Sequence, residues 1–161
     1  MNGKTIEIVS TDAEGRLTLA DAVTYAQEQG NQEIIDFATL TGAVVIALGE
    51  DTTGLFGNDK DNIAKLIECG NGQGESIWEL PITDFTKEKV RGSKVADLTN
   101  STGRGAGASG AAGFIAEFIN EGTKWMHLDI AGTAFSTSPS KGQFYGASGA
   151  TLKSVYKYLE K

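Results

Sequence analysis

The stretch EIIDFATLTGAVVIALG, residues 33–49, decides the class of fold. Its first part, residues 33–38, is short and apolar with bulky side chains, which predicts a buried strand. Its second part, residues 39–49, has two interpretations. It continues the strand, or it turns into a short helix, because threonines and a glycine precede small apolar residues. The pattern of the rest of the chain then decides whether such strands alternate with helices.

Strand-like and helix-like patterns do alternate on both sides of this stretch. Strands are expected at residues 5–9, 53–58, 76–83 and 125–131, and helices at residues 17–29, 59–69, 111–120 and 148–159. We expect the last helix to turn Leu152, Val155, Tyr156 and Leu159 inward. The alternation predicts a single α/β domain in three layers, with a central β-sheet and helices on both of its faces.

Composition and charge exclude several classes of function. The 161 residues carry a net charge of −7, so the chain lacks the basic face that a nucleic acid or an anionic membrane would need. The longest strongly apolar run, residues 43–48, is too short to span a bilayer, and residues 1–10 do not resemble a signal peptide. A lone cysteine, Cys69, excludes an internal disulfide and fits a reducing cytoplasm. We expect Cys69 to be half-buried in the core.

Ligands in such folds bind at the carboxyl ends of strands, and residues 10–22, STDAEGRLTLADA, follow a predicted strand. The chain has one histidine and one cysteine, which excludes a zinc site built from those ligands and requires a carboxylate-rich metal site. Asp12 and Glu14 are the best pair for it, although acids before a helix also cap its free N–H groups. The planar guanidinium of Arg16 suits an oxyanion, or it forms an ordinary surface salt bridge.

A glycine-rich segment before the helix at residues 111–120 matches G-x-G-x-x-G at Gly105, Gly107 and Gly110. In a nucleotide-binding module this pattern holds a phosphate at a helix N-terminus. The preceding residues, VADLTNST, are too polar for the first strand of such a module, and no acidic partner for a ribose follows. A tight turn with close helix packing is therefore preferred, and a phosphate- or nucleotide-binding module is the alternative.

The histidine and the lysines are interpreted as structural. His127 and Asp129 lie two positions apart on one predicted strand and so share a face, which predicts a hydrogen-bonded pair inside the domain. Lys4, Lys94 and Lys141 are interpreted as solvated. None of these side chains is predicted to carry chemistry.

Five segments together resemble one family. STDAEGRLTLADA closely resembles the signature N-T-D-A-E-G-R-L of the leucyl aminopeptidases, the cytosol aminopeptidase family. DFATLTGA, GAGASGAAGFIAEF, HLDIAGTA and YGASG are similar to that family in order and spacing, so the resemblance covers essentially the whole chain. One departure is Ser10, where asparagine is usual.

The resemblance implies a two-metal exopeptidase that releases N-terminal residues, often leucine, from peptides. It implies that Asp12 and Glu14 bind two divalent ions, usually zinc, manganese or magnesium, with Glu14 bridging. Arg16 would hold a bicarbonate that acts as general base toward a metal-bound water, with help from the backbone of Leu40. Thr39, Gly42, Ala131 and Ala134 would line the pocket for the first side chain of the substrate. Two metals lower the pKa of bridging water and stabilise charge on the scissile carbonyl.

The resemblance also implies what these residues lack. In the family, a lysine and two aspartates that bind metal, and a second lysine that polarises the carbonyl, come before the signature. Only eleven residues precede Asp12 here. We therefore expect residues 1–161 to be the carboxyl-terminal portion of a catalytic domain, with weak or no metal binding and negligible peptidase activity on their own.

The resemblance carries expectations about partners as well. Family members are typically hexamers, so we expect a cytoplasmic homo-oligomer that binds peptides and neither nucleic acid nor membrane. Apolar surface and a strand edge left open by the absent part would favour self-association. A non-catalytic interaction domain is the remaining alternative for this chain.

Overall fold

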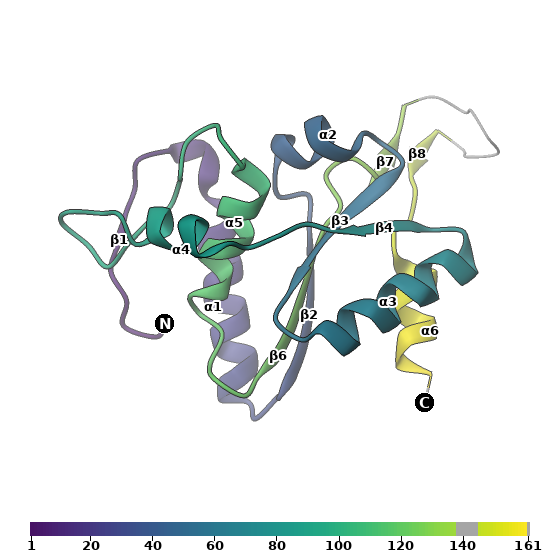
Figure 1. The fold of residues 1–161 in the computed structure, drawn as a ribbon, viewed down its shortest axis with the longest axis horizontal. Helices are drawn as coiled ribbons and strands as arrows, with labels where there is room; N and C mark the ends of the chain where they lie inside the picture. Colours follow the sequence, from purple (N-terminus) through teal and green to yellow (C-terminus); the bar gives the residue numbers. More distant parts are fainter. Residues whose placement is uncertain (138–144, 161) are drawn as a thin grey trace.

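The computed structural model describes residues 1–137 and 145–160, and a mixed four-stranded sheet lies at its centre (Figure 1). The strand order is β2-β6-β3-β4, with β3 antiparallel to β6 and the other neighbouring pairs parallel. The strands are β2 Glu33–Ala38, β6 Lys124–Asp129, β3 Thr52–Gly57 and β4 Ser76–Glu79. The chain leaves β2 and β6 at the same edge, which brings their following loops together.

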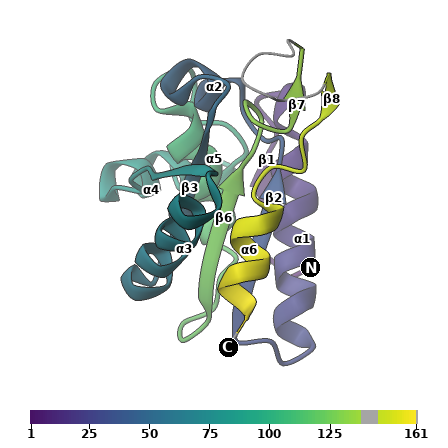
Figure 2. The same ribbon diagram turned by 90° about the vertical axis from the view of Figure 1, so that its right-hand side faces the viewer.

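Helices cover both faces of this sheet, as Figure 2 shows. One side carries α1 Gly15–Glu28, α4 Asp84–Val90 and α5 Gly107–Ala116, and the other carries α3 Lys60–Gln73 and α6 Leu152–Leu159. Each side has its own apolar core, the first around Phe114 and Trp125 and the second around Leu66 and Met126. The predicted three-layer α/β fold is therefore confirmed. Cys69 is half-buried against the second core, as expected.

Short strands extend the structure at two places. The parallel pair β1 Ile6–Glu7 and β5 Leu98–Thr99 lies beyond α1, and β7 Phe135–Ser136 pairs antiparallel with β8 Gly146–Ala147. No helix in the described ranges is long and apolar enough to cross a membrane.

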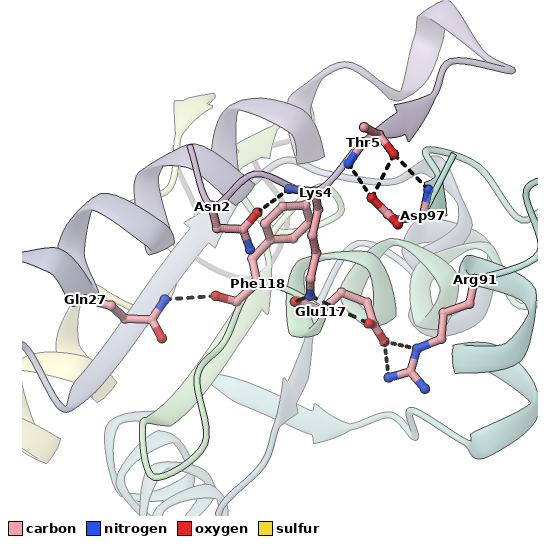
Figure 3. A network of polar contacts seen from close by, with 8 residues as sticks. All are labelled: Asn2, Lys4, Thr5, Gln27, Arg91, Asp97, Glu117 and Phe118. Carbon is pink, nitrogen blue, oxygen red and sulfur yellow. Dashed lines mark hydrogen bonds and ion pairs between the residues drawn. The ribbon is translucent and has the colours of Figure 1, made fainter. Parts of the chain in front are cut away.

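The N-terminal segment is tied to α5 and to the approach to β5 (Figure 3). Thr5 donates from its backbone N and its Oγ1 to Oδ2 of Asp97, at 2.8 and 2.7 Å. Lys4 donates from Nζ to the backbone carbonyl of Glu117 and lies over the ring of Phe118. Lys4 is exposed, as expected, and it also has protein partners. These contacts fix the chain just before the segment that carries Asp12.

The stretch of residues 39–49 forms a helix, which resolves the open interpretation. β2 ends at Ala38, and α2 spans Gly42–Leu48 at one end of the sheet. The Oγ1 of Thr41 accepts a hydrogen bond from Val44 N at 3.1 Å and caps α2. The strand expected at residues 76–83 ends earlier, at Glu79, and α4 follows without having been predicted.

The expected inward face of α6 is wrong. Leu152, Tyr156 and Leu159 are 70%, 67% and 62% exposed, whereas Ser154 and Tyr158 are buried. Val155 alone of the four packs partly against the core. Polar contacts set the rotation of the helix: Ser154 donates to Glu75, and the Tyr158 hydroxyl donates to Glu33 Oε1 at 2.5 Å. The periodicity of the apolar residues predicted a helix but not which side of it faces the core. Lys141 lies outside the described residues.

Candidate active site

The segment between β1 and α1 is shaped by one buried amide, that of Asn100, which directly follows β5. Its Oδ1 accepts from the backbone N–H groups of Val9 and Ser10 at 2.9 and 3.2 Å, and its Nδ2 donates to the Ser10 carbonyl at 2.6 Å. A short 3-10 turn, Thr11–Ala13, follows. It leaves Asp12 and Glu14 exposed, and neither side chain makes a capping hydrogen bond. Helix capping therefore does not account for these two acids.

Arg16 lies in the first turn of α1 and is only 9% exposed. Its Nη1 donates to the backbone carbonyl of Asn100 at 3.0 Å, but its Nε is buried without a partner among the described residues. Burial lowers the pKa of Arg16, while the charges of Asp129 and Glu14 raise it. Arginine stays protonated in proteins, so this is a buried cation with an unused donor. The surface salt bridge considered from the sequence does not form here.

The loop between β2 and α2 is held by Asp129, the last residue of β6, which is 1% exposed. Its Oδ1 accepts from the backbone N–H groups of Leu40 and Ala131 at 3.1 and 3.2 Å. Its Oδ2 accepts from the hydroxyl of Thr41 at 2.7 Å. The segments that follow β2 and β6 are thus joined at one carboxylate.

The segment that carries Asp12 and Arg16, the segment after β2 and the glycine-rich loop line a cavity of about 390 Å³. Its lining includes Asp12, Arg16, Leu40, Thr41, Gly42 and Arg104. Four of the predicted site residues, Asp12, Arg16, Leu40 and Gly42, therefore meet in one space. Glu14, Thr39, Ala131 and Ala134 do not line the cavity. Thr39 is exposed and the two alanines are half-buried, with Ala131 bonded to the carboxylate that also holds Leu40.

The donor set fits an anion better than it fits a complete metal site. The unpartnered Nε of a buried arginine beside a cavity is the feature expected of an oxyanion site. Catalytic metal ions usually take about three protein ligands. Within residues 1–137 and 145–160, no group of three or more histidine, cysteine, aspartate and glutamate side chains could hold a metal ion. Asp12 and Glu14 thus fit only a part of a metal site.

The predicted pair of His127 and Asp129 is wrong. His127 is fully buried, and its Nδ1 lies 2.5 Å from Oδ1 of Asp36 on β2. Asp36 also accepts from Trp125 Nε1 at 2.7 Å. Asp36 and His127 are direct partners across the parallel strands, whereas residues two apart on one strand are separated by about 6.6 Å of rise. The neighbouring strand therefore supplies the closer carboxylate.

Close packing explains most of the glycine-rich segment. A Cβ added at Gly110 would lie 2.1 Å from Thr102 Oγ1, and one at Gly107 would lie 3.0 Å from Ala43 Cβ. Gly105 has open space around it. The preferred interpretation of a tightly packed helix start thus holds at two of the three glycines.

Sequence reasoning missed Asn100, Thr41 and Arg104. The first lies in the polar run before the glycines, which was set aside as unlike a strand. Arg104 lies among those glycines, where a cation within a glycine-rich loop was the available signal. The threonines before α2 did indicate a helix start, but the hydrogen bond of Thr41 to a carboxylate 88 residues away had no local signal.

The fold is that of an aminopeptidase catalytic domain. Residues 1–156 match the model described as the cytosol aminopeptidase family, catalytic domain, and the chain belongs to that family. A probable cytosol aminopeptidase of Fusobacterium nucleatum is 47% identical over 164 residues, which cover 99% of this chain and 34% of that protein.

Two solved structures are similar. A mutant tomato leucine aminopeptidase has a TM-score of 0.91 at 40% identity, over 98% of this chain and 30% of its own. The bottromycin maturation enzyme BotP in complex with Mn has a TM-score of 0.93 at 35% identity, over 99% and 36%. The chain thus spans about a third of the length of these relatives.

Proposed function

We propose that residues 1–161 form part of the catalytic centre of a metal-dependent aminopeptidase that releases leucine-like N-terminal residues from peptides. The observation that carries the proposal is that Asp12, Arg16 and Leu40 line one cavity. Family membership supports the same reaction. We assign residues 1–161 to the carboxyl-terminal portion of the catalytic domain, as the family resemblance implies; the relatives are about three times as long.

In this proposal each side chain has a separate role. Asp12 and Glu14 contribute carboxylates to two divalent ions, Mn²⁺ or Zn²⁺ or Mg²⁺, which activate water when bound. Arg16 and the backbone at Leu40 hold a bicarbonate. The buried, unpartnered Nε of Arg16 supports the anion role, since a charged donor gains strongly from an oxyanion partner.

Four small or polar residues complete the substrate pocket in this proposal: Thr39, Gly42, Ala131 and Ala134. The position of Gly42 in the cavity lining supports its assignment. Ala131 contacts the same carboxylate as Leu40, so it lies beside the cavity. Peptides are the proposed partners, within a cytoplasmic homo-oligomer.

The 161 residues by themselves are proposed to bind metal weakly and to have negligible turnover. The lack of a cluster of three metal-binding side chains among the described residues supports this part. The isolated chain should therefore not hydrolyse leucine p-nitroanilide with Mn²⁺ or Zn²⁺. Clear turnover that Asp12→Asn abolishes would overturn the proposal of an incomplete site.

A chimera tests the proposed function itself. These residues replace the matching third of the Fusobacterium nucleatum relative, and the purified chimera is assayed with leucine p-nitroanilide. We expect hydrolysis, and a loss of kcat/KM of about a hundredfold or more with Asp12→Asn. Asp21→Asn, a change of an exposed acid on α1, serves as the matched control and should leave activity within about twofold. A folded chimera without activity would contradict the assignment.

A further inference from the structure

The carboxylate of Asp129 is buried at the end of β6, and burial of a charged group is costly unless donors surround it. Four hydrogen bonds reach it. Oδ1 accepts from the backbone N–H groups of Leu40, Thr41 and Ala131 at 3.1, 3.4 and 3.2 Å, and Oδ2 accepts from the Thr41 hydroxyl at 2.7 Å. Three of the four donors belong to loop 39–42, which lines the cavity, and the fourth belongs to the loop that follows β6.

Thr41 connects Asp129 to α2. Its hydroxyl donates to Asp129 and accepts from the backbone N–H of Val44 at 3.1 Å, so a single oxygen joins the end of β6 to the first turn of the helix. Thr41 is itself buried, at 7% exposure. The conformation of residues 39–42 therefore depends on hydrogen bonds to Asp129 on β6 and not on the loop sequence alone.

Asp129 also acts on Arg16 without bonding to it. The negative charge of Asp129 raises the pKa of the guanidinium, yet Arg16 donates its hydrogen bond to the carbonyl of Asn100, and its Nε has no partner among the described residues. A direct ion pair would have filled the donors of Arg16. The separation leaves those donors for another anion while the cation keeps an opposite charge nearby.

We infer that Asp129 is a positioning residue: it fixes loop 39–42 through three hydrogen bonds and leaves the donors of Arg16 free for an oxyanion. This inference rests on the anion-binding role proposed above. The oxyanion class is that of carbonate and carboxylate, which are planar and match the guanidinium fork.

The same strand supplies a matched control. His127 lies two residues before Asp129 on β6, is fully buried, and also joins β6 to β2 through its contact with Asp36. It does not line the cavity. A change at His127 should therefore lower stability without altering anion binding.

The experiment is a titration of the ¹⁵N-labelled 161-residue chain with sodium bicarbonate, against sodium chloride at equal ionic strength, followed by NMR at the Leu40 and Thr41 amides and the Arg16 Nε–H. The wild type should show saturable shifts at these three groups. Asp129→Asn should weaken bicarbonate binding at least tenfold. Loss of a negative charge near Arg16 would by itself strengthen anion binding, so positioning and simple charge predict opposite signs.

Two variants at Thr41 provide an alternative test if Asp129→Asn does not fold. Thr41→Val removes the hydroxyl and should weaken binding, whereas Thr41→Ser keeps it and should bind within twofold of the wild type. His127→Gln should melt at a lower temperature and bind within twofold. Unchanged or tighter binding by Asp129→Asn, or by Thr41→Val where the first variant does not fold, would overturn the inference.

Hydrogen exchange separates this inference from the function it rests on. If the wild type shows no bicarbonate shifts, the proposed anion site is wrong. The positioning role is then decided without any anion, by exchange at the Leu40 and Thr41 amides. Faster exchange in Asp129→Asn but not in His127→Gln supports it, and equal exchange in wild type and Asp129→Asn refutes it.

Discussion

Arg16 and Asn100 lie 84 positions apart and are joined by a hydrogen bond of 3.0 Å from the guanidinium Nη1 to the backbone carbonyl. The side chain of Asn100 meanwhile holds the backbone of Val9 and Ser10. One residue therefore fixes both the segment that carries Asp12 and the cation beside it. The site depends on this long-range contact as much as on the local signature.

Asn100→Ala should lower the free energy of unfolding by about 2–4 kcal/mol, because it removes a fully buried amide that accepts from the backbone N–H groups of Val9 and Ser10. Urea denaturation measures this. The control is Asn31→Ala, which removes an exposed hydrogen bond to Ala26 and should cost less than about 1 kcal/mol. Equal losses for both variants would show that Asn100 is not a structural centre.

Asp36→Asn should lower the free energy of unfolding by about 1–3 kcal/mol, because His127 and Trp125 both bond to this carboxylate inside the sheet. Thermal and urea unfolding report the change. Asp61→Asn, at an exposed site on α3, is the matched substitution and should be close to neutral. A neutral Asp36→Asn would mean that the pair contributes nothing net to stability.

Gly132→Ala should be destabilising by about 1–3 kcal/mol and should shift the loop that carries Ala131 and Ala134. Its Cβ would lie 2.2 Å from the backbone oxygen of Gly49, which cannot move aside as a side chain can. In contrast, Gly72→Ala on α3 meets nothing within 4 Å and should be neutral or stabilising by up to about 1 kcal/mol. The prediction fails if the two variants unfold alike.

The exposed stripe on α6, formed by Leu152, Tyr156 and Leu159, should make the chain self-associate. The free edge of β2 offers a second route to association. Light scattering over a range of concentrations should show dimers or larger species, and Leu152→Glu with Tyr156→Lys should reduce them. Lys153→Arg, an exposed change on the same helix that keeps the charge and the stripe, is the control and should leave association unchanged. A wild type that stays monomeric at all concentrations would refute this prediction.

Local sequence predicts the elements of this fold well but not their rotation or their partners. β2 has the bounds expected of it, because its bulky apolar residues favour a strand regardless of context. The sequence did not decide between a strand and a helix for residues 39–49, because that choice depends on the contact of Thr41 with Asp129. The rotation of α6 was wrong, because Glu75 and Glu33 bind its polar residues from distant parts of the chain.

The candidate site shows the same division. Asp12, Arg16 and Leu40 were found through the family signature and the segment after β2, and they do line one cavity. Asn100 was missed because its role depends on hydrogen bonds to the backbone of Val9 and Ser10, which are distant in the sequence. His127 was predicted to pair with Asp129 instead of Asp36, because the sequence of one strand does not show which strand lies beside it.

Paramagnetic broadening of backbone amide signals by Mn²⁺ in the 161-residue chain tests whether Asp12 and Glu14 bind metal. We expect weak, saturable broadening that begins at residues 12–16 and 40–42 and disappears in the double variant Asp12→Asn, Glu14→Gln. A second acidic cavity, lined by Glu50, Asp51 and Glu75, serves as the internal comparison. Broadening that centres there, or that the double variant leaves unchanged, would contradict the assignment of Asp12 and Glu14 to the metal site.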